Sequence, residues 1–165
     1  MRFLLIDRIV DLQPGVRIKA VKSLTMTEEY LADHFPNFPV MPGVLMLEAM
    51  TQASAWLIRT SEDFAHSMVT LKQAGNVKYG HFLEPGQTLV VTVEILSQTD
   101  DETKVKAQGA VNDRVIVSGR LVLARYNLAD THADQVVLDE AIVKDLRETF
   151  QVLNQTGPQI PQTQS

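Results

Sequence analysis

The sequence predicts an α+β fold in which an antiparallel sheet wraps around one central hydrophobic helix. Residues 44–58 are apolar on nearly every side, which is typical of a buried helix. Strand-like segments precede and follow this helix, and those that follow it are joined by hairpin-sized connections. A helix that is apolar all round must be covered on all sides, and a curved sheet is the most economical cover.

The expected strands either alternate apolar and polar residues or are rich in valine, isoleucine and leucine. A short helix is expected at residues 27–31, where a threonine suited to capping is followed by two glutamates. An interruption near Gly75-Asn76 leaves open whether residues 68–82 form one strand or two. The expected strands are residues 3–12, 16–25, 68–82, 87–96, 103–111 and 114–125.

The composition of the chain changes near residue 127. From there onward six acidic residues face two basic ones, whereas the preceding part is almost neutral. We therefore predict a domain over residues 1–126 and an acidic extension over residues 127–165, with a helix at about 138–153 and a disordered tail. Asp139 is a candidate cap of that helix. The apolar stripe of the helix is expected to pack on the same domain or on a second copy, and it comprises Leu138, Ile142, Leu146, Phe150 and Leu153.

Composition argues against several classes of function. A chain of 165 residues suits one domain, and a net charge of −5 without a basic stripe argues against binding to nucleic acid. No apolar stretch is long enough for a membrane span, and the first residues meet a charge too early for a signal peptide. The absence of cysteine excludes disulfides and thiolate chemistry and fits a cytoplasmic location. No two of the four histidines have metal-ligand spacing, so neither a metal nor a cofactor is expected.

One stretch carries the candidate chemistry. It reads His34-Phe-Pro-Asn-Phe-Pro-Val-Met-Pro-Gly43 and continues as Val44-Leu-Met-Leu-Glu48-Ala-Met-Thr-Gln52. Three prolines within seven residues restrict the loop and hold His34, and Pro42-Gly43 then opens the helix. Glu48 is a lone carboxylate among apolar residues, with Gln52 one turn further on. A carboxyl group in an apolar setting near a constrained histidine suits general acid–base chemistry. The alternative is that Glu48 faces solvent or forms a structural ion pair.

This stretch closely resembles the signature of the 3-hydroxyacyl-[acyl-carrier-protein] dehydratases of the FabZ type. Phe3-Leu-Leu-Ile-Asp-Arg is similar to the first strand of that family, and Val77-Lys-Tyr-Gly-His-Phe-Leu-Glu-Pro-Gly86 is similar to its Lys-Phe-x-x-x-Val-x-Pro-Gly segment, so the resemblance covers roughly residues 3–125. It implies a hotdog fold whose protomers join their sheets edge to edge, as a homodimer or a trimer of dimers. In such a dimer His34 would meet Glu48 of the partner chain.

The resemblance also implies an activity: removal of water from a 3-hydroxyacyl thioester of acyl carrier protein, giving the trans-2-enoyl thioester in fatty acid biosynthesis. His34 suits the base, because an imidazole titrates near neutral pH, and a protonated Glu48 suits the acid for the departing hydroxyl. The coupled pair leaves open which group makes which proton transfer. The Gly43 N–H is a candidate oxyanion donor, and Gln52 would orient the Glu48 carboxyl.

Candidates for further substrate contacts follow from residue type. Phe35, Phe38, Met46 and Met50 are candidates for lining an acyl tunnel, although ordinary core packing explains them equally well. Because a carrier protein is acidic, basic residues near the tunnel mouth should bind it. The candidates for that role are Arg59, Lys72, Lys78 and Arg120.

Some positions depart from the family pattern, and other functions remain open. Asp33 stands where the family usually has glycine, and Tyr79 and Gly80 stand where phenylalanine and a basic or small residue are common. An isomerising dehydratase of the FabA type usually carries aspartate at the Glu48 position. A hotdog acyl thioesterase would not need His34 on a proline-rich loop. A non-catalytic acyl-binding or carrier-binding module of a larger synthase is the alternative from another class.

Overall fold

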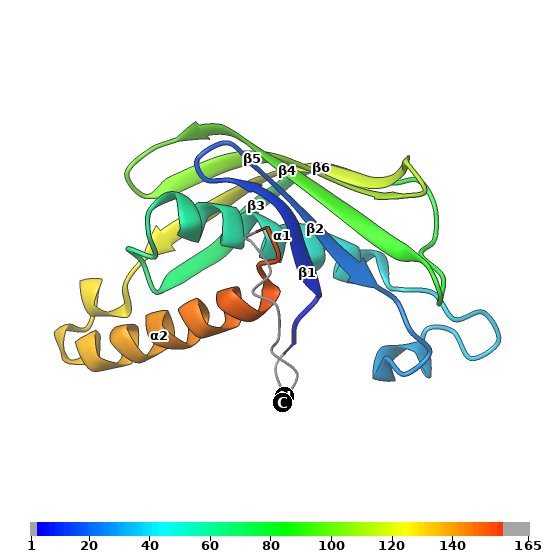
Figure 1. The fold of residues 1–165 in the computed structure, drawn as a ribbon, viewed down its shortest axis with the longest axis horizontal. Helices are drawn as coiled ribbons and strands as arrows, with labels where there is room; N and C mark the ends of the chain where they lie inside the picture. Colours follow the sequence, from blue (N-terminus) through cyan, green and yellow to red (C-terminus); the bar gives the residue numbers. More distant parts are fainter. Residues whose placement is uncertain (1–2, 157–165) are drawn as a thin grey trace, which may run out of the picture.

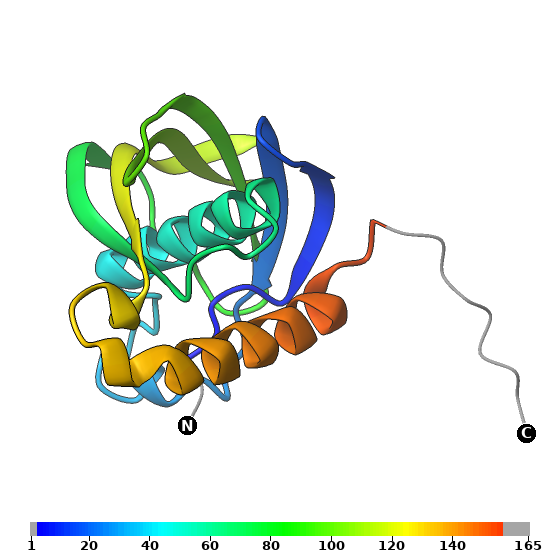
Figure 2. The same ribbon diagram turned by 90° about the vertical axis from the view of Figure 1, so that its left-hand side faces the viewer.

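A computed structural model describes residues 3–156 of the chain. Its strands form one antiparallel sheet, and the long helix α1 (Gly43–Ser61) lies against the concave face of that sheet (Figures 1 and 2). In space the strands follow the order β1-β2-β4-β5-β6-β3, so β1 and β3 are the two edges. In chain order they are β1 (Arg8–Gln13), β2 (Arg17–Ser23), β3 (Met68–Tyr79), β4 (Thr88–Gln98), β5 (Glu102–Val111) and β6 (Arg114–Tyr126).

Every expected strand is present, with shifted ends. The first begins at Arg8 rather than at residue 3. Residues 68–82 contain a single strand, β3, which ends at Tyr79 and whose register on β6 shifts between Gly75 and Lys78. The short helix expected at residues 27–31 is one 3₁₀ turn, η1 (Glu29–Leu31).

The core lies between the concave face of the sheet and α1. Alternate residues of the strands point toward the helix, as the period of two in the sequence predicts. The helix is buried over most of its length, because the sheet curves around it (Figure 2). The fully buried side chains that meet there include Ile18, Leu89, Val91, Val93, Leu121 and Leu123 from the strands and Met50, Ala53 and Leu57 from the helix. The predicted α+β hotdog fold is therefore confirmed.

The C-terminal helix α2 (Val136–Leu153) lies beneath the open side of the curved sheet (Figure 2). Its last turns pack on the domain: the Phe150 ring lies 6.1 Å from Trp56 and 5.7 Å from Phe64, and Leu153 is buried. Leu138, which the expected stripe includes, is instead half-exposed, because the first turn of the helix extends past the core. The helix therefore packs on its own domain. The tail for which the sequence predicts disorder, residues 157–165, lies outside the described residues.

Asp139 does not cap its own helix. The residue at the cap position is Gln135, which makes no capping hydrogen bond through its side chain. The buried carboxylate of Asp139 instead accepts hydrogen bonds from the N–H groups of Leu128 and Ala129, both at 2.9 Å, and from the Ser67 hydroxyl. Desolvation raises the pKa of this carboxyl group, but the three hydrogen bonds outweigh it and hold the pKa below its ordinary value. Asp139 thus ties α2 to the loops that precede it.

Candidate active site

His34 is held by the backbone of its own loop. Its N–H donates to the carbonyl oxygen of Tyr30 at 3.1 Å, and its carbonyl oxygen accepts the N–H of Val40 at 3.2 Å. The imidazole Nδ1 lies 3.2 Å from the carbonyl oxygen of Val40. A carbonyl oxygen only accepts, so Nδ1 must carry the proton and Nε2 of the neutral ring keeps a free lone pair. The ring also stacks on Phe35, with centroids 4.1 Å apart.

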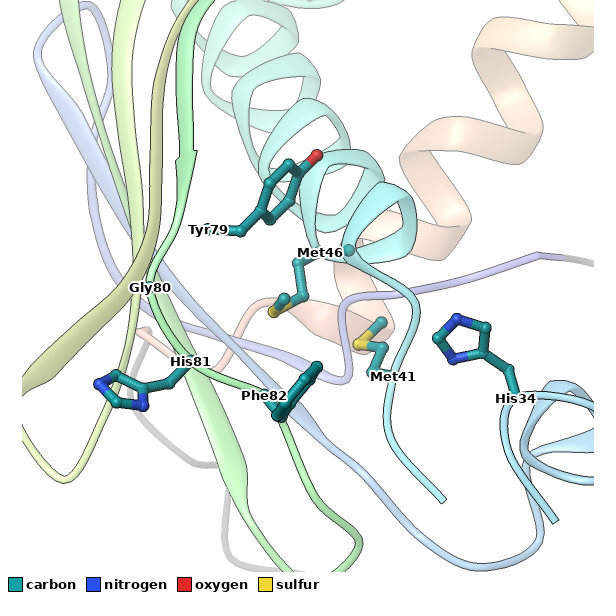
Figure 3. A pocket seen from close by; sticks show the side chains of 8 residues that line it. His34, Met41, Met46, Tyr79, Gly80, His81 and Phe82 are labelled. Atoms are coloured by element: carbon teal, nitrogen blue, oxygen red, sulfur yellow. The ribbon is translucent and has the colours of Figure 1, made fainter. Parts of the chain in front are cut away.

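A pocket of about 210 Å³ opens beside this imidazole (Figure 3). Three segments meet there: the loop from His34 to Met41, the start of α1, and the end of β3 with the residues after it. Its walls are largely apolar, and the exposed Phe82 ring at its rim meets Phe38 edge-on at 5.4 Å. The lining residues are His34, Met41, Gly43, Met46, Tyr79, Gly80, His81 and Phe82.

Gly43 is the first residue of α1. The Tyr79 ring occupies the space that a side chain at this position would need. A Cβ atom at this position would lie 3.0 Å from Cε1 of the Tyr79 ring. Among residues 3–156 no acceptor takes up the Gly43 N–H, which lies at the positive end of the helix dipole. The pocket therefore has a free N–H donor at one wall and the imidazole at another. The sequence gives no hint that Tyr79 packs on Gly43, because the two are far apart along the chain.

The contact between Gly43 and Tyr79 predicts the effect of a substitution. In Gly43→Ala the new methyl group should push the Tyr79 ring, which is free to move because it is half-exposed. We expect the melting temperature to change little and kcat/KM to fall roughly tenfold or more, since the N–H shifts relative to the pocket. The double variant Gly43→Ala/Tyr79→Ala is the control, because removal of the ring gives the methyl group room. Equal kcat/KM in the wild type and in Gly43→Ala would contradict this account.

Glu48 and Gln52 form a second group, on a different face of α1. The Gln52 Nε2 donates to Glu48 Oε1 at 3.0 Å and to the Phe3 carbonyl oxygen at 3.0 Å. The Gln52 Oε1 accepts the Leu5 N–H at 2.9 Å. Because the amide nitrogen donates on one side and the amide oxygen accepts on the other, these hydrogen bonds fix the orientation of the Gln52 side chain. The half-buried Glu48 carboxylate is therefore held in place by Gln52. It does not line the pocket that contains His34.

Within one chain, the structure brings together some of the predicted site residues but not others. His34, Gly43 and Met46 share the pocket. Met50 does not, because it is fully buried in the core between α1 and the sheet. Phe35 and Phe38 are half-exposed and do not line the pocket, although each contacts one lining residue, His34 and Phe82 respectively.

The four basic residues that the sequence suggests for carrier binding lie in different surroundings. The Arg59 guanidinium lies 5.4 Å from the Trp56 ring centroid, and burial lowers its pKa to about 10 although Glu62 opposes this. Lys72 pairs with Glu102. Lys78 and Arg120 instead line a hollow on the outer face of the sheet, together with Lys106. Arg59 and Lys72 are thus engaged within the chain, whereas Lys78 and Arg120 form no ion pair within residues 3–156.

Over residues 3–156 no group of three histidine, aspartate or glutamate side chains is arranged to hold a metal ion. No helix in the same part of the chain combines the length and apolar character needed to cross a bilayer.

Fold and site together define a hotdog protein with a histidine, a free helix N-terminus and an apolar pocket. Comparison with known proteins gives the family. The sequence model of the FabA-like domain matches residues 1–120. A 3-hydroxyacyl-[acyl-carrier-protein] dehydratase FabZ from Caldicellulosiruptor bescii is 36% identical over 122 residues, 74% of this chain and 87% of that protein. The FabZ of Wolbachia pipientis is 34% identical over 119 residues, 72% of this chain and 83% of that protein. The chain belongs to the FabA-like family and is of the FabZ type.

Solved structures agree on the fold. A chain of the dehydratase heterocomplex from Xenorhabdus doucetiae superposes with a TM-score of 0.63 at 18% identity, over 81% of this chain and 89% of that chain. A Streptococcus mutans protein bound to acetyl-CoA has a TM-score of 0.57 at 11% identity, over 76% of this chain and 91% of that chain. At such identities the likeness concerns the fold.

Proposed function

We propose that this chain is a dehydratase of fatty acid biosynthesis, which removes water from 3-hydroxyacyl thioesters of acyl carrier protein and yields trans-2-enoyl thioesters. The observation that carries the proposal is the pocket in which the His34 imidazole and the unpaired Gly43 N–H meet, in a chain of the FabZ type. The proposed location is the cytoplasm, which agrees with the lack of cysteine.

The proposed reaction assigns one step to each polar group. The His34 Nε2 removes the C2 proton, since its hydrogen-bonded Nδ1 leaves Nε2 as the basic nitrogen. Negative charge then develops on the thioester oxygen, where the Gly43 N–H donates a hydrogen bond. The C3–O bond breaks as protonated Glu48 donates to the departing hydroxyl, which leaves as water. The C2–H electrons form the new double bond, so no oxidant or cofactor takes part.

The scheme needs a second copy of the chain, because Glu48 lies outside the pocket of its own protomer. We propose a homodimer, alone or in a trimer of dimers, in which Glu48 of one protomer faces His34 of its partner. Two features support this arrangement. Among residues 3–156 no strand pairs with the outer side of the edge strand β3, so this strand offers unpaired backbone groups to a second sheet. Exposed apolar side chains also gather on β3 and near Glu48, and they include Phe3, Leu4, Val44, Leu71, Tyr79 and Phe82.

We also propose that the carrier protein docks on the hollow of about 310 Å³ that Lys78, Lys106 and Arg120 line on the outer face of the sheet. Lys106 and Arg120 are direct cross-strand partners, and like charges in that position repel each other. Glu94 on β4 lies opposite Lys106 on the other side of that residue, but none of the three cations forms an ion pair among residues 3–156. Lys78 directly precedes Tyr79, which lines the pocket, so a carrier docked here would lie close to the reaction site.

Charge reversal tests the docking surface. We expect Lys106→Glu/Arg120→Glu to raise KM for a carrier-bound substrate roughly tenfold or more and to leave KM for a short pantetheine thioester unchanged. The wild-type KM for the carrier substrate should also rise with salt. The matched control is Lys19→Glu, an exposed lysine on β2 that lies outside the hollow. A wild-type KM for the carrier substrate in the double variant would contradict this docking surface.

Product analysis separates the proposed function from its alternatives. A dehydratase forms enoyl thioester and keeps the thioester bond, whereas a thioesterase releases free thiol. A non-catalytic module binds the thioester and forms neither product. Mass spectrometry of the carrier after incubation with 3-hydroxybutyryl thioester distinguishes the three, and the proposal requires a loss of one water from the carrier-bound group.

A further inference from the structure

The loop that carries His34 is almost isolated from the rest of the protein in its polar contacts. We call residues 25–40 the His34 loop; they connect β2 to the segment before α1. Its backbone hydrogen bonds all run within the loop, as do the side-chain contacts between Thr25 and Thr27 and between His34 and Val40. Among residues 3–156 one polar contact leaves the loop, and it joins Glu28 to Lys22.

This contact is an ion pair formed by a buried lysine and a partly buried glutamate. The Lys22 Nζ lies 2.6 Å from Glu28 Oε1, and the lysine side chain is only 7% exposed on β2. Asp7, just before β1, lies 3.7 Å from the same nitrogen and accepts the Ser23 N–H at 2.6 Å through its other oxygen. A buried ammonium group with two carboxylates has a defined position, because leaving either charge unpaired inside the protein is costly.

The ion pair is connected to His34 by a short path. Glu28 precedes the 3₁₀ turn η1, and its carbonyl oxygen accepts the Leu31 N–H at 3.1 Å. Within this turn, the Tyr30 carbonyl oxygen accepts the His34 N–H at 3.1 Å. Glu28 is therefore connected through this turn to the backbone from which the imidazole projects into the pocket.

The other contacts of the loop with the protein are apolar. Leu31 and Val40 are buried, and the Phe38 ring meets Phe82. Apolar burial is non-directional and tolerates sliding, whereas a charged hydrogen bond fixes both distance and direction. Backbone hydrogen bonds anchor the two ends of the loop, from the Leu24 N–H to Gln87 and from the Met41 N–H to Leu83. Between these ends, the contact of Glu28 with Lys22 is the one charged contact to the domain among residues 3–156.

We propose that Lys22 is a positioning residue of the active site, which acts through Glu28 to fix the imidazole of His34 relative to the pocket. This role rests on the proposed function, because it matters for rate only if His34 takes part in the reaction. It assigns a catalytic consequence to a residue that does not touch the pocket.

The test uses the full-length protein and four variants. In Lys22→Met the stem is retained and the charge is lost, and Glu28→Gln removes the opposite charge from the less buried partner. We expect each to lower kcat roughly 10- to 100-fold with a smaller change in KM, because misplacement of a catalytic group acts on the chemical step. The double variant should be no slower than Lys22→Met, since that substitution alone already removes the contact with Glu28. Lys22→Arg, which keeps the ion pair, should recover most of the rate.

A matched control is available on the same strand. Arg17 on β2 forms an exposed ion pair with Asp11 at 3.1 Å, outside the loop, so Arg17→Met should have wild-type kcat. Nitrogen NMR of the imidazole reports the placement of His34 without any turnover: in Lys22→Met the Nδ1 resonance should lose its hydrogen-bonded shift, while in Arg17→Met it should keep it. If Lys22→Met does not fold, Glu28→Gln carries both measurements.

The outcomes separate this inference from the proposed function. Wild-type kcat and an unchanged imidazole spectrum in folded Lys22→Met and Glu28→Gln would overturn the positioning role while leaving the dehydratase proposal intact. A rate loss that is additive in the double variant, or that Lys22→Arg fails to restore, would also overturn it. An active His34→Ala protein would instead overturn the proposed function, and the NMR result would still report whether the ion pair fixes the loop.

Discussion

Replacing His34 with alanine is expected to lower kcat roughly 10²- to 10⁴-fold, the range typical of losing a general base. The fold should survive. The two hydrogen bonds that hold this part of the loop, His34 N–H to Tyr30 and Val40 N–H to His34, involve only the backbone, and the imidazole contributes one further contact to the Val40 carbonyl. Circular dichroism and the melting temperature should therefore match the wild type within a few degrees, while dehydration of the thioester slows by this factor.

The pocket contains a natural control for this variant. His81 also lines the pocket, but its ring is exposed and points away from Met46 and His34 in Figure 3. His81→Ala should therefore keep most of the wild-type kcat. Loss of activity in His81→Ala together with full activity in His34→Ala would exchange the roles of the two histidines. Full activity in both variants would remove histidine from the mechanism.

The second large effect concerns Glu48. We expect Glu48→Gln to lose roughly 10²-fold or more of kcat, since the amide has the shape of the carboxylic acid but no acidic proton. The amide retains an oxygen at the position where Gln52 donates, so the local hydrogen bond survives and stability should change little.

The two inactive variants together test where the site lies. If His34 of one protomer works with Glu48 of the other, a mixed dimer of His34→Ala and Glu48→Gln contains one intact site and one site without either group. Random exchange makes about half of the dimers mixed, so activity should return to about one quarter of the wild type. Activity is measured before and after the two proteins are unfolded and refolded together. No recovery, with mixed dimers demonstrated by mass spectrometry, would place both groups of each site in one chain.

The sequence predicts the elements of this fold well where periodicity is strong. The apolar helix at residues 44–58 corresponds to α1, because a helix that is apolar all round is buried on every face. The alternating segments correspond to the strands, because alternation reflects burial of one face of a sheet. The ends of elements are less predictable. Leu138 continues the apolar stripe of α2, but nothing in the local pattern shows that the core ends before it reaches that turn.

Contacts between distant parts of the chain cannot be read from local patterns. Asp139 looks like a helix cap, yet its carboxylate binds Ser67, which is 72 positions away. Gly43 looks like a residue needed at a helix start, whereas the structure shows that the Tyr79 ring fills the space of its missing side chain. His34 and Gly43 share a pocket, as the resemblance to the FabZ family implies. Glu48 lies outside it, and only a second chain would bring that carboxyl group into the site.

The central claim is that water is removed from a 3-hydroxyacyl thioester beside His34. The most direct measurement follows absorbance of the enoyl thioester when the wild type is given 3-hydroxybutyryl carrier protein, with the His34→Ala variant measured in parallel. The account predicts catalysed formation of enoyl thioester to the same equilibrium that crotonyl carrier protein reaches from the other side, at a rate roughly 10²-fold or more lower in the variant. A folded wild-type oligomer that binds the carrier thioester but forms no enoyl product would contradict it and identify a binding module.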